Sequence, residues 1–146
     1  MRSSPRHPVP VTPSPVPVTA NGDGSRAVGR DVARRVVLPI PPSANHLRIP
    51  SRGRLITAPE YRTWQEAAHL LVRAGMRPVE RYPVAVIVTL RTPDKRRDLD
   101  NVCKPCIDAL VAGGVLVDDN VRHIDGIVLR HETHDTADVV VEIDEL

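Results

Sequence analysis

Aromatic residues are scarce in this chain of 146 residues, which has one tryptophan, two tyrosines and no phenylalanine. The hydrophobic share is nevertheless 41%, which is enough for the core of one domain, so that core has to be aliphatic. Valine and isoleucine favour strands, whereas alanine and leucine favour helices. The composition therefore favours a single domain with valine-rich strands and with helices rich in alanine and leucine.

Cysteines and long apolar runs are also nearly absent. Two cysteines three positions apart cannot stabilise a fold by disulfide bonds, which indicates a reducing compartment. No apolar run approaches the ~18 residues of a membrane span, and the N-terminus lacks the apolar core of a signal peptide. We therefore expect a cytoplasmic protein with no membrane partner.

Proline, in contrast, is concentrated near the N-terminus, at positions 5, 8, 10, 13, 15 and 17. Proline at this density blocks helix formation and strand pairing. Residues 1–34 are therefore expected to form a disordered, proline-rich tail, and residues 35–146 the folded domain.

The folded part alternates between strand-like and helix-like segments. Pro59 suits the first position of a helix and Gly75 its end. The expected elements are a strand at 35–40, a hairpin or extended loop from residue 47 with Arg52, Gly53 and Arg54 at its tip, a helix at 59–74, a central strand at 82–92, a helix at about 101–112, and strands within 121–133 and 137–145. This order predicts an α/β (α+β) fold with one mixed sheet and two main helices packed on it.

The spacing of apolar residues predicts which face of each helix is buried. In the first helix the apolar stripe consists of Trp64, Ala67, Ala68, Leu71 and Val72. In the second it consists of Ile107, Leu110 and Val111, and Gly113-Gly114 ends the helix.

The net charge of +2 conceals an uneven distribution of charge along the chain. Residues 48–104 hold twelve basic and six acidic side chains, a balance of +6, whereas residues 105–146 hold two basic and ten acidic ones, a balance of −8. A basic half can bind a polyanion and an acidic half a cation, although solvated surface of mixed sign is an equally good interpretation.

The stretch "RRDLDNVCKPCIDAL", residues 96–110, combines two chemical signatures. Cys103 and Cys106 have the C-x-x-C spacing of redox and zinc motifs. However, nearby aspartates disfavour a thiolate, and the available histidines, His123, His131 and His134, lack the usual zinc spacing. The favoured interpretation is that both cysteines are small packing residues.

Asp98 and Asp100 form the second signature. If this piece is extended, both carboxylates point to one face, where their repulsion requires either a compensating cation or the protonation of one of them. Carboxylate oxygens select Mg²⁺ or Mn²⁺. Asp118 and Asp119 follow the second helix, and a strand running back would return them to the same edge of the sheet. Taken singly, these acids could also be helix caps and turn residues.

The stretch "RRDLDNVCKPCIDALVAGGVLVDDN" resembles the core motif of the RusA-type Holliday junction resolvases, which are crossover junction endodeoxyribonucleases. The shared features are D-x-D-N, a lysine four residues after the second Asp, a leucine-containing helix, a glycine and D-D. The upstream "LPIPPSANHLR" resembles the family's first strand and its P-P-S-x-N, which contains Asn45. The resemblance covers about residues 35–145.

The resemblance implies a Mg²⁺-dependent homodimer that makes symmetric nicks in four-way DNA junctions, in a bacterial or phage-infected cell. It implies that Asp98, Asp100 and Asp119 bind metal and act in catalysis, that Asp118 has a lesser role at the metal, and that Lys104 stabilises the transition state. A lysine that is merely solvated, or is paired with Asp108, is the alternative.

Residues expected to contact DNA are Asn45, Arg48, Arg52, Arg54, Lys95, Arg96 and Arg97. Two alternatives stay open at this point: a metal-dependent nuclease for other branched DNA, and a DNA-binding module without catalysis. The sequence also differs from the RusA-type family in two respects. The lack of aromatic residues leaves a base-stacking wedge without an obvious side chain, and Pro105 is expected to delay the start of the second helix.

Overall fold

The computed structural model describes residues 34–43 and 47–146. The segment expected to form a proline-rich tail, up to residue 33, and Asn45 lie outside the described residues. None of the described helices is both long enough and apolar enough to cross a membrane.

Four strands form one mixed sheet in the order β1-β6-β4-β5. Their bounds are Arg34–Pro39 for β1, Val84–Arg91 for β4, Ile124–Glu132 for β5 and Asp138–Glu145 for β6. β6 pairs antiparallel with both β1 and β4, whereas β5 pairs parallel with β4. The apolar run of β4 thus lies inside the sheet, as expected for a strand covered by its neighbours.

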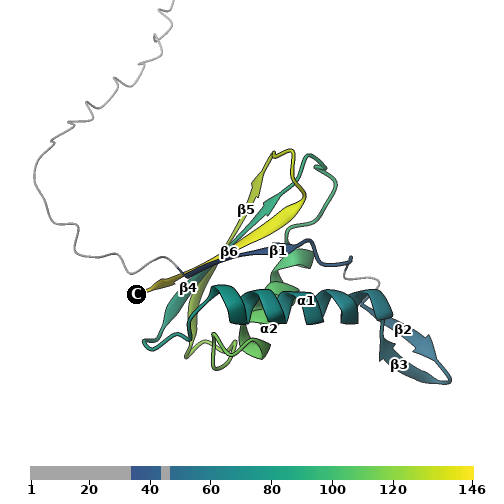
Figure 1. Cartoon of the computed structure of the whole chain (residues 1–146), viewed down its shortest axis with the longest axis horizontal. Coiled ribbons are helices and arrows are strands. Elements are labelled where there is room, and N and C mark those ends of the chain that lie inside the picture. Colours follow the sequence, from purple (N-terminus) through teal and green to yellow (C-terminus); the bar gives the residue numbers. More distant parts are fainter. Residues whose placement is uncertain (1–33, 44–46) are drawn as a thin grey trace, which may run out of the picture.

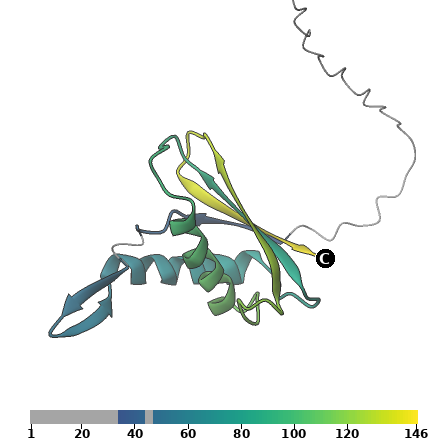
Figure 2. The ribbon, with the colours of Figure 1, turned by 180° about the vertical axis from the view of Figure 1, so that it is seen from behind.

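Two helices, α1 (Pro59–Gly75) and α2 (Asp100–Ala112), pack on the same side of the sheet (Figure 1). Seen from behind, α2 crosses in front of α1 (Figure 2). Alternate side chains of β4 and β6 point toward the helices and are buried: Val84, Val86, Val88, Leu90, Val139, Val141 and Ile143. The core is therefore an aliphatic layer, as the composition predicts.

The buried stripe of α1 is narrower than its sequence suggests. Tyr61, Trp64, Ala68 and Val72 are buried, but Ala67 is exposed and the side chain of Leu71 is 42% exposed. The expectation that both residues belong to the buried stripe was wrong, because they lie on the flank of a helix that rests on the sheet along one line.

Trp64 also fixes how α1 meets the first strand. Its indole Nε1 donates a hydrogen bond of 2.7 Å to the carbonyl oxygen of Pro39. Its ring stacks on Tyr61 with 5.8 Å between ring centroids. Trp64 therefore joins α1 to the end of β1, and Tyr61, one turn earlier on α1, packs against its ring.

The second helix begins earlier than Pro105 suggests. α2 starts at Asp100, and Pro105 is buried in its second turn. The expectation that Pro105 delays the start of the helix was wrong. Proline removes only one backbone hydrogen bond, the one to the carbonyl oxygen of Asn101. The burial of Cys106, Ile107 and Leu110 offsets that loss. Val111, in contrast, is only partly buried.

The expected hairpin is confirmed, but it does not join the main sheet. β2 (Arg48–Ser51) and β3 (Arg54–Thr57) form a separate two-stranded sheet. Arg52 and Gly53 form the tip with φ angles of 47° and 75°. The hairpin projects beyond the N-terminal end of α1 (Figure 1).

The contact between α1 and the end of α2 generates a stability prediction. A Cβ atom on Gly113 would lie 2.4 Å from Val72 Cγ1 and 2.9 Å from the Ala109 carbonyl oxygen. We expect Gly113→Ala to lower the free energy of unfolding by about 1–3 kcal/mol, the usual cost of overpacking. Gly126→Ala is the control, because no atom lies within 4 Å of a Cβ there. Urea denaturation curves measure both, and equal stability of the two variants would contradict the prediction.

Candidate active site

The two aspartates of D-x-D lie at the start of α2. Leu99, between them, has φ −66° and ψ −36°, which is helical rather than extended backbone. The condition under which Asp98 and Asp100 would share one face, an extended segment, is therefore not met, because residues two apart in helical geometry point in different directions. Asp100 instead occupies the first turn of α2, where the positive end of the helix dipole favours its negative charge.

Lys104 lies one turn farther along α2 and contacts two acids. Its Nζ donates to Asp108 Oδ1 and to Asp119 Oδ2, each at 2.6 Å. The side chains remain 65%, 42% and 40% exposed, respectively, so the cluster is open to solvent and to a ligand. The pairing of Lys104 with Asp108, the structural alternative for this lysine, is present, and Asp119 binds the same ammonium group.

The charges in this cluster shift one another's protonation. The hydrogen bonds from Lys104 to Asp108 and then to Asp119 raise the pKa of the lysine, so its ammonium form is favoured. The hydrogen bond and the charge of Lys104 lower the pKa of Asp119. Asp119 is therefore held as a carboxylate, which is the form that can bind a cation.

The loop that carries Asp118 and Asp119 is held by a network of polar side chains. Asn120 Nδ2 donates to Asp118 Oδ2 at 2.6 Å, and the amide oxygen of Asn120 lies 3.0 Å from His123 Nδ1. That nitrogen therefore carries the proton, because the amide oxygen can only accept. The His123 ring meets Tyr82 edge-on at 4.7 Å, and the Tyr82 hydroxyl accepts a bond from the Val117 backbone N–H.

None of Tyr82, Asn120 and His123 was expected to support the acidic loop. The i,i+4 spacing reveals the contact of Lys104 with Asp108, but no local pattern links Tyr82 with Val117, which lies 35 residues away. His123, first considered as a zinc ligand, instead connects the loop to the start of β4.

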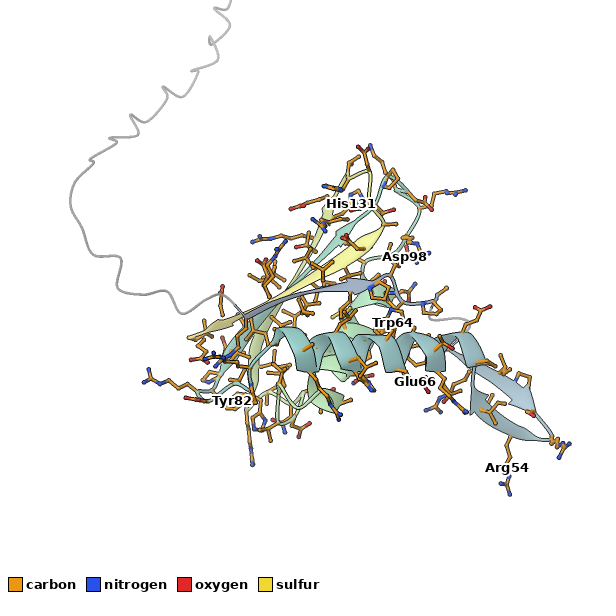
Figure 3. All side chains as sticks on the ribbon, viewed as in Figure 1. Arg54, Trp64, Glu66, Tyr82, Asp98 and His131 are labelled. Atoms are coloured by element: carbon orange, nitrogen blue, oxygen red, sulfur yellow. The ribbon has the colours of Figure 1, made fainter. Side chains whose placement is uncertain are left out.

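The acids are distributed along α2 instead of being gathered at one point. Figure 3 shows Asp98 and Tyr82 far apart, with the loop that Tyr82 holds near the opposite end of α2. Carboxylate oxygens have the right chemistry for Mg²⁺. In the described part of the chain, however, no three His, Cys, Asp or Glu side chains lie close enough to hold one metal ion. The donors thus suit Mg²⁺ in type, but their arrangement in this conformation does not fit a single ion.

The two cysteines are packing residues. Burial raises the pKa of Cys106 to about 12, and burial is also the main cause that raises the pKa of Cys103. Both pKa values are raised, as expected, but burial rather than the acidic neighbours is the main cause: at Cys103 the charge of Lys104, which lowers the pKa, outweighs that of Asp100. His131 and His134 contact Thr92 and Thr136, respectively, so neither approaches a zinc site with these cysteines.

The basic residues expected to bind DNA fall into two groups. Lys95, Arg96 and Arg97 lie in the loop between β4 and α2, directly before Asp98, and Arg96 forms a salt bridge of 3.0 Å with Asp94. Arg97 Nη1 lies 3.4 Å from the carbonyl oxygen of Pro41. The second group, Arg48, Arg52 and Arg54, lies on the β2–β3 hairpin, where the labelled Arg54 extends away from the body of the protein (Figure 3).

The position of Lys104 between two acids generates a titration prediction. Since Lys104 lowers the pKa of Asp119, Lys104→Met should raise that pKa toward the usual value of an aspartate. Lys95→Met removes the same charge from the loop before α2 and should leave the pKa of Asp119 unchanged. Carboxyl ¹³C NMR over a pH series measures both. An unaltered Asp119 pKa in Lys104→Met would show that the ion pair is absent in solution.

Comparison with known proteins places this site in a family. The sequence profile described as "Endodeoxyribonuclease RusA" matches residues 39–144. A protein of Escherichia coli O139:H28 named "Crossover junction endodeoxyribonuclease RusA" is 32% identical over 88 residues, which cover 59% of this chain and 73% of that protein. The proteins of the same name from Escherichia coli K12 and from Enterobacteria phage 82 are each 33% identical over 86 residues, or 58% of this chain and 72% of theirs. The acids and the lysine of α2 and its following loop therefore lie in a DNA endonuclease, and the chain belongs to the RusA family of endodeoxyribonucleases.

Proposed function

We propose that this endonuclease resolves four-way (Holliday) DNA junctions by paired symmetric nicks in a Mg²⁺-dependent reaction, during recombination and repair or phage DNA processing. The proposal rests on one observation above all: Asp100 and Lys104 lie on one helix, Asp98 lies two residues before it and Asp119 in the loop after it, in a chain of this family. The names of the relatives support the choice of junctions as substrate.

Paired nicks require two sites, and the described part of the chain carries one such acid–lysine cluster. We therefore propose a homodimer in which each copy cuts one strand. DNA is the partner, and the cytoplasm of a bacterium or phage-infected cell is the compartment where that substrate is available.

Asp98, Asp100 and Asp119, with Asp118 beside them, are the acids we propose as metal ligands, and Mn²⁺ is an alternative to Mg²⁺ because it prefers the same oxygen ligands. They do not surround one ion in the described conformation, so metal binding would require them to move closer together. A bound Mg²⁺ would supply positive charge to the phosphodiester and activate water. Lys104 would move from Asp119 toward the phosphate and offer its ammonium group to the developing negative charge. The exposure of Lys104 leaves its side chain room for that movement.

The basic side chains would bind the DNA backbone at two places. Lys95, Arg96 and Arg97 precede Asp98 directly, so they would hold the phosphates next to the scissile bond. Contacts of this kind position DNA without reading its sequence. Arg48, Arg52, Arg54 and Asn45 are proposed as further DNA contacts.

A cleavage assay on a synthetic four-way junction tests the proposal. Each strand is labelled in turn, and the protein is incubated in Mg²⁺, in Ca²⁺ or in EDTA. Two symmetric nicks in Mg²⁺ alone support the proposal. Preferential cleavage of a flap would instead favour a nuclease for other branched DNA, and binding without cleavage in Mg²⁺ or Mn²⁺ would favour a DNA-binding module. Multi-angle light scattering measures the oligomeric state.

Asp100→Asn should lower the single-turnover cleavage rate by about 10²-fold or more, the scale seen when one preorganised charged group is lost from an active site. Junction affinity in Ca²⁺ should persist, because one negative charge near the phosphates is removed. Asp125→Asn makes the same change on β5, outside the acid–lysine cluster, and should cleave at the wild-type rate. Equal rates for the two variants would exclude Asp100 from the site.

A further inference from the structure

The β2–β3 hairpin exposes apolar side chains to an unusual degree. The side chain of Leu55 is 67% exposed, and those of Ile49 and Ile56 are 37% and 40% exposed. Leu55 pairs with Pro50 across the hairpin, and Ile49 pairs with Ile56. Because paired residues share a face of the ribbon, one face carries Pro50 and Leu55 and the other carries the two isoleucines. Both faces of this small sheet are therefore apolar near the tip.

The same hairpin carries three arginines and no acidic residue. Residues 47–58 contain Arg48, Arg52 and Arg54, and their sequence has neither Asp nor Glu. Within the described part of the chain, the ion pairs engage other basic residues and none of these three. The hairpin is thus a positively charged arm whose charges are available to a polyanion.

A two-stranded ribbon with exposed apolar faces is only marginally stable in water. Exposed apolar side chains of this kind gain free energy when a partner covers them. The uncompensated charge of the three arginines selects a partner that is negatively charged and that also offers apolar surface. Branched DNA has both properties: its phosphates are anionic, and the faces of its bases are accessible where the arms meet.

We propose that the β2–β3 hairpin is a DNA-inserting arm in which Leu55, backed by Pro50, packs against bases at the centre of a branched DNA while Arg48, Arg52 and Arg54 hold the flanking phosphates. This inference rests on the proposed function and adds to it the element that opens the junction. Apolar side chains that enter DNA partially unstack base steps, and they need not be aromatic. A leucine on a β-ribbon thus supplies the wedge that the scarcity of aromatic residues left unassigned.

The test uses a four-way junction with 2-aminopurine at the branch point, because this base fluoresces more strongly when it is unstacked. Binding is measured in Ca²⁺ with the full chain, so that the result does not depend on cleavage. The wild-type protein should raise the emission, and Leu55→Ala should lose more than about half of that rise, since a methyl group no longer reaches between bases. Leu55→Met, which keeps the length and apolar character, should restore it.

Leu70→Ala is the matched control. Leu70 is 68% exposed on α1, so the same truncation removes an equally exposed leucine from a different surface. This variant should give the full rise in emission. Arg52→Ala should behave in a third way: the slope of log affinity against log salt should flatten by about one unit, with an unchanged emission per bound complex.

Two results would overturn the proposal. One is an unchanged emission rise in saturated complexes of Leu55→Ala. The other is a change from dimer to monomer in Leu55→Ala but not in Leu70→Ala, which would assign the apolar hairpin to a second copy of the chain. Absence of junction cleavage by the wild-type protein in Mg²⁺ would refute the proposed function instead, and the Ca²⁺ measurements would still decide the role of the hairpin.

Discussion

The aliphatic layer between the two helices and the sheet determines where every acid of the active site lies. Val86, Val88 and Val141 of the sheet and Cys106, Ile107 and Leu110 of α2 are buried in the same hydrophobic core. These side chains are small and aliphatic apart from the cysteine, so close packing of small groups holds the helix in place. The exposed side of α2 then carries Lys104, and the loop after it returns Asp119 to that lysine.

Lys104 sets the electrostatics of the site because it is one ammonium group among five aspartates of residues 98–119. Its two hydrogen bonds of 2.6 Å place one positive charge between Asp108 and Asp119 and reduce the repulsion between these two acids. A metal ion at Asp119 would compete with this ammonium group for the same oxygen. The conformation described here is thus a site in which the Lys104 ammonium group already occupies Asp119, and the proposed metal would have to displace it.

The secondary structure could be predicted from the sequence because its signals are local. Pro59 and Gly75 mark the ends of α1, and the apolar run of β4 indicates a central strand. The arrangement of the acids could not be predicted in the same way. It depends on the helical conformation of Leu99 and on the contact between Tyr82 and Val117, which are set by packing between distant segments. The separation of the hairpin from the main sheet is likewise a long-range property.

The basic and acidic halves of the chain have different structural roles. Six of the twelve basic residues of positions 48–104 lie on the hairpin and on the loop before Asp98, whereas the acids of the second half lie mostly on α2, its following loop and the two last strands. On the sheet, Asp138 forms a salt bridge with Arg91 and Glu145 forms one with Arg34, so these acids contribute little to the electrostatic potential around the protein. Around α2, Asp98, Asp100 and Asp118 form no salt bridge within the described part of the chain, and their charges repel phosphate unless a cation lies between them. A basic arm that binds DNA outside this region therefore offsets the repulsion and lets the backbone approach the carboxylates.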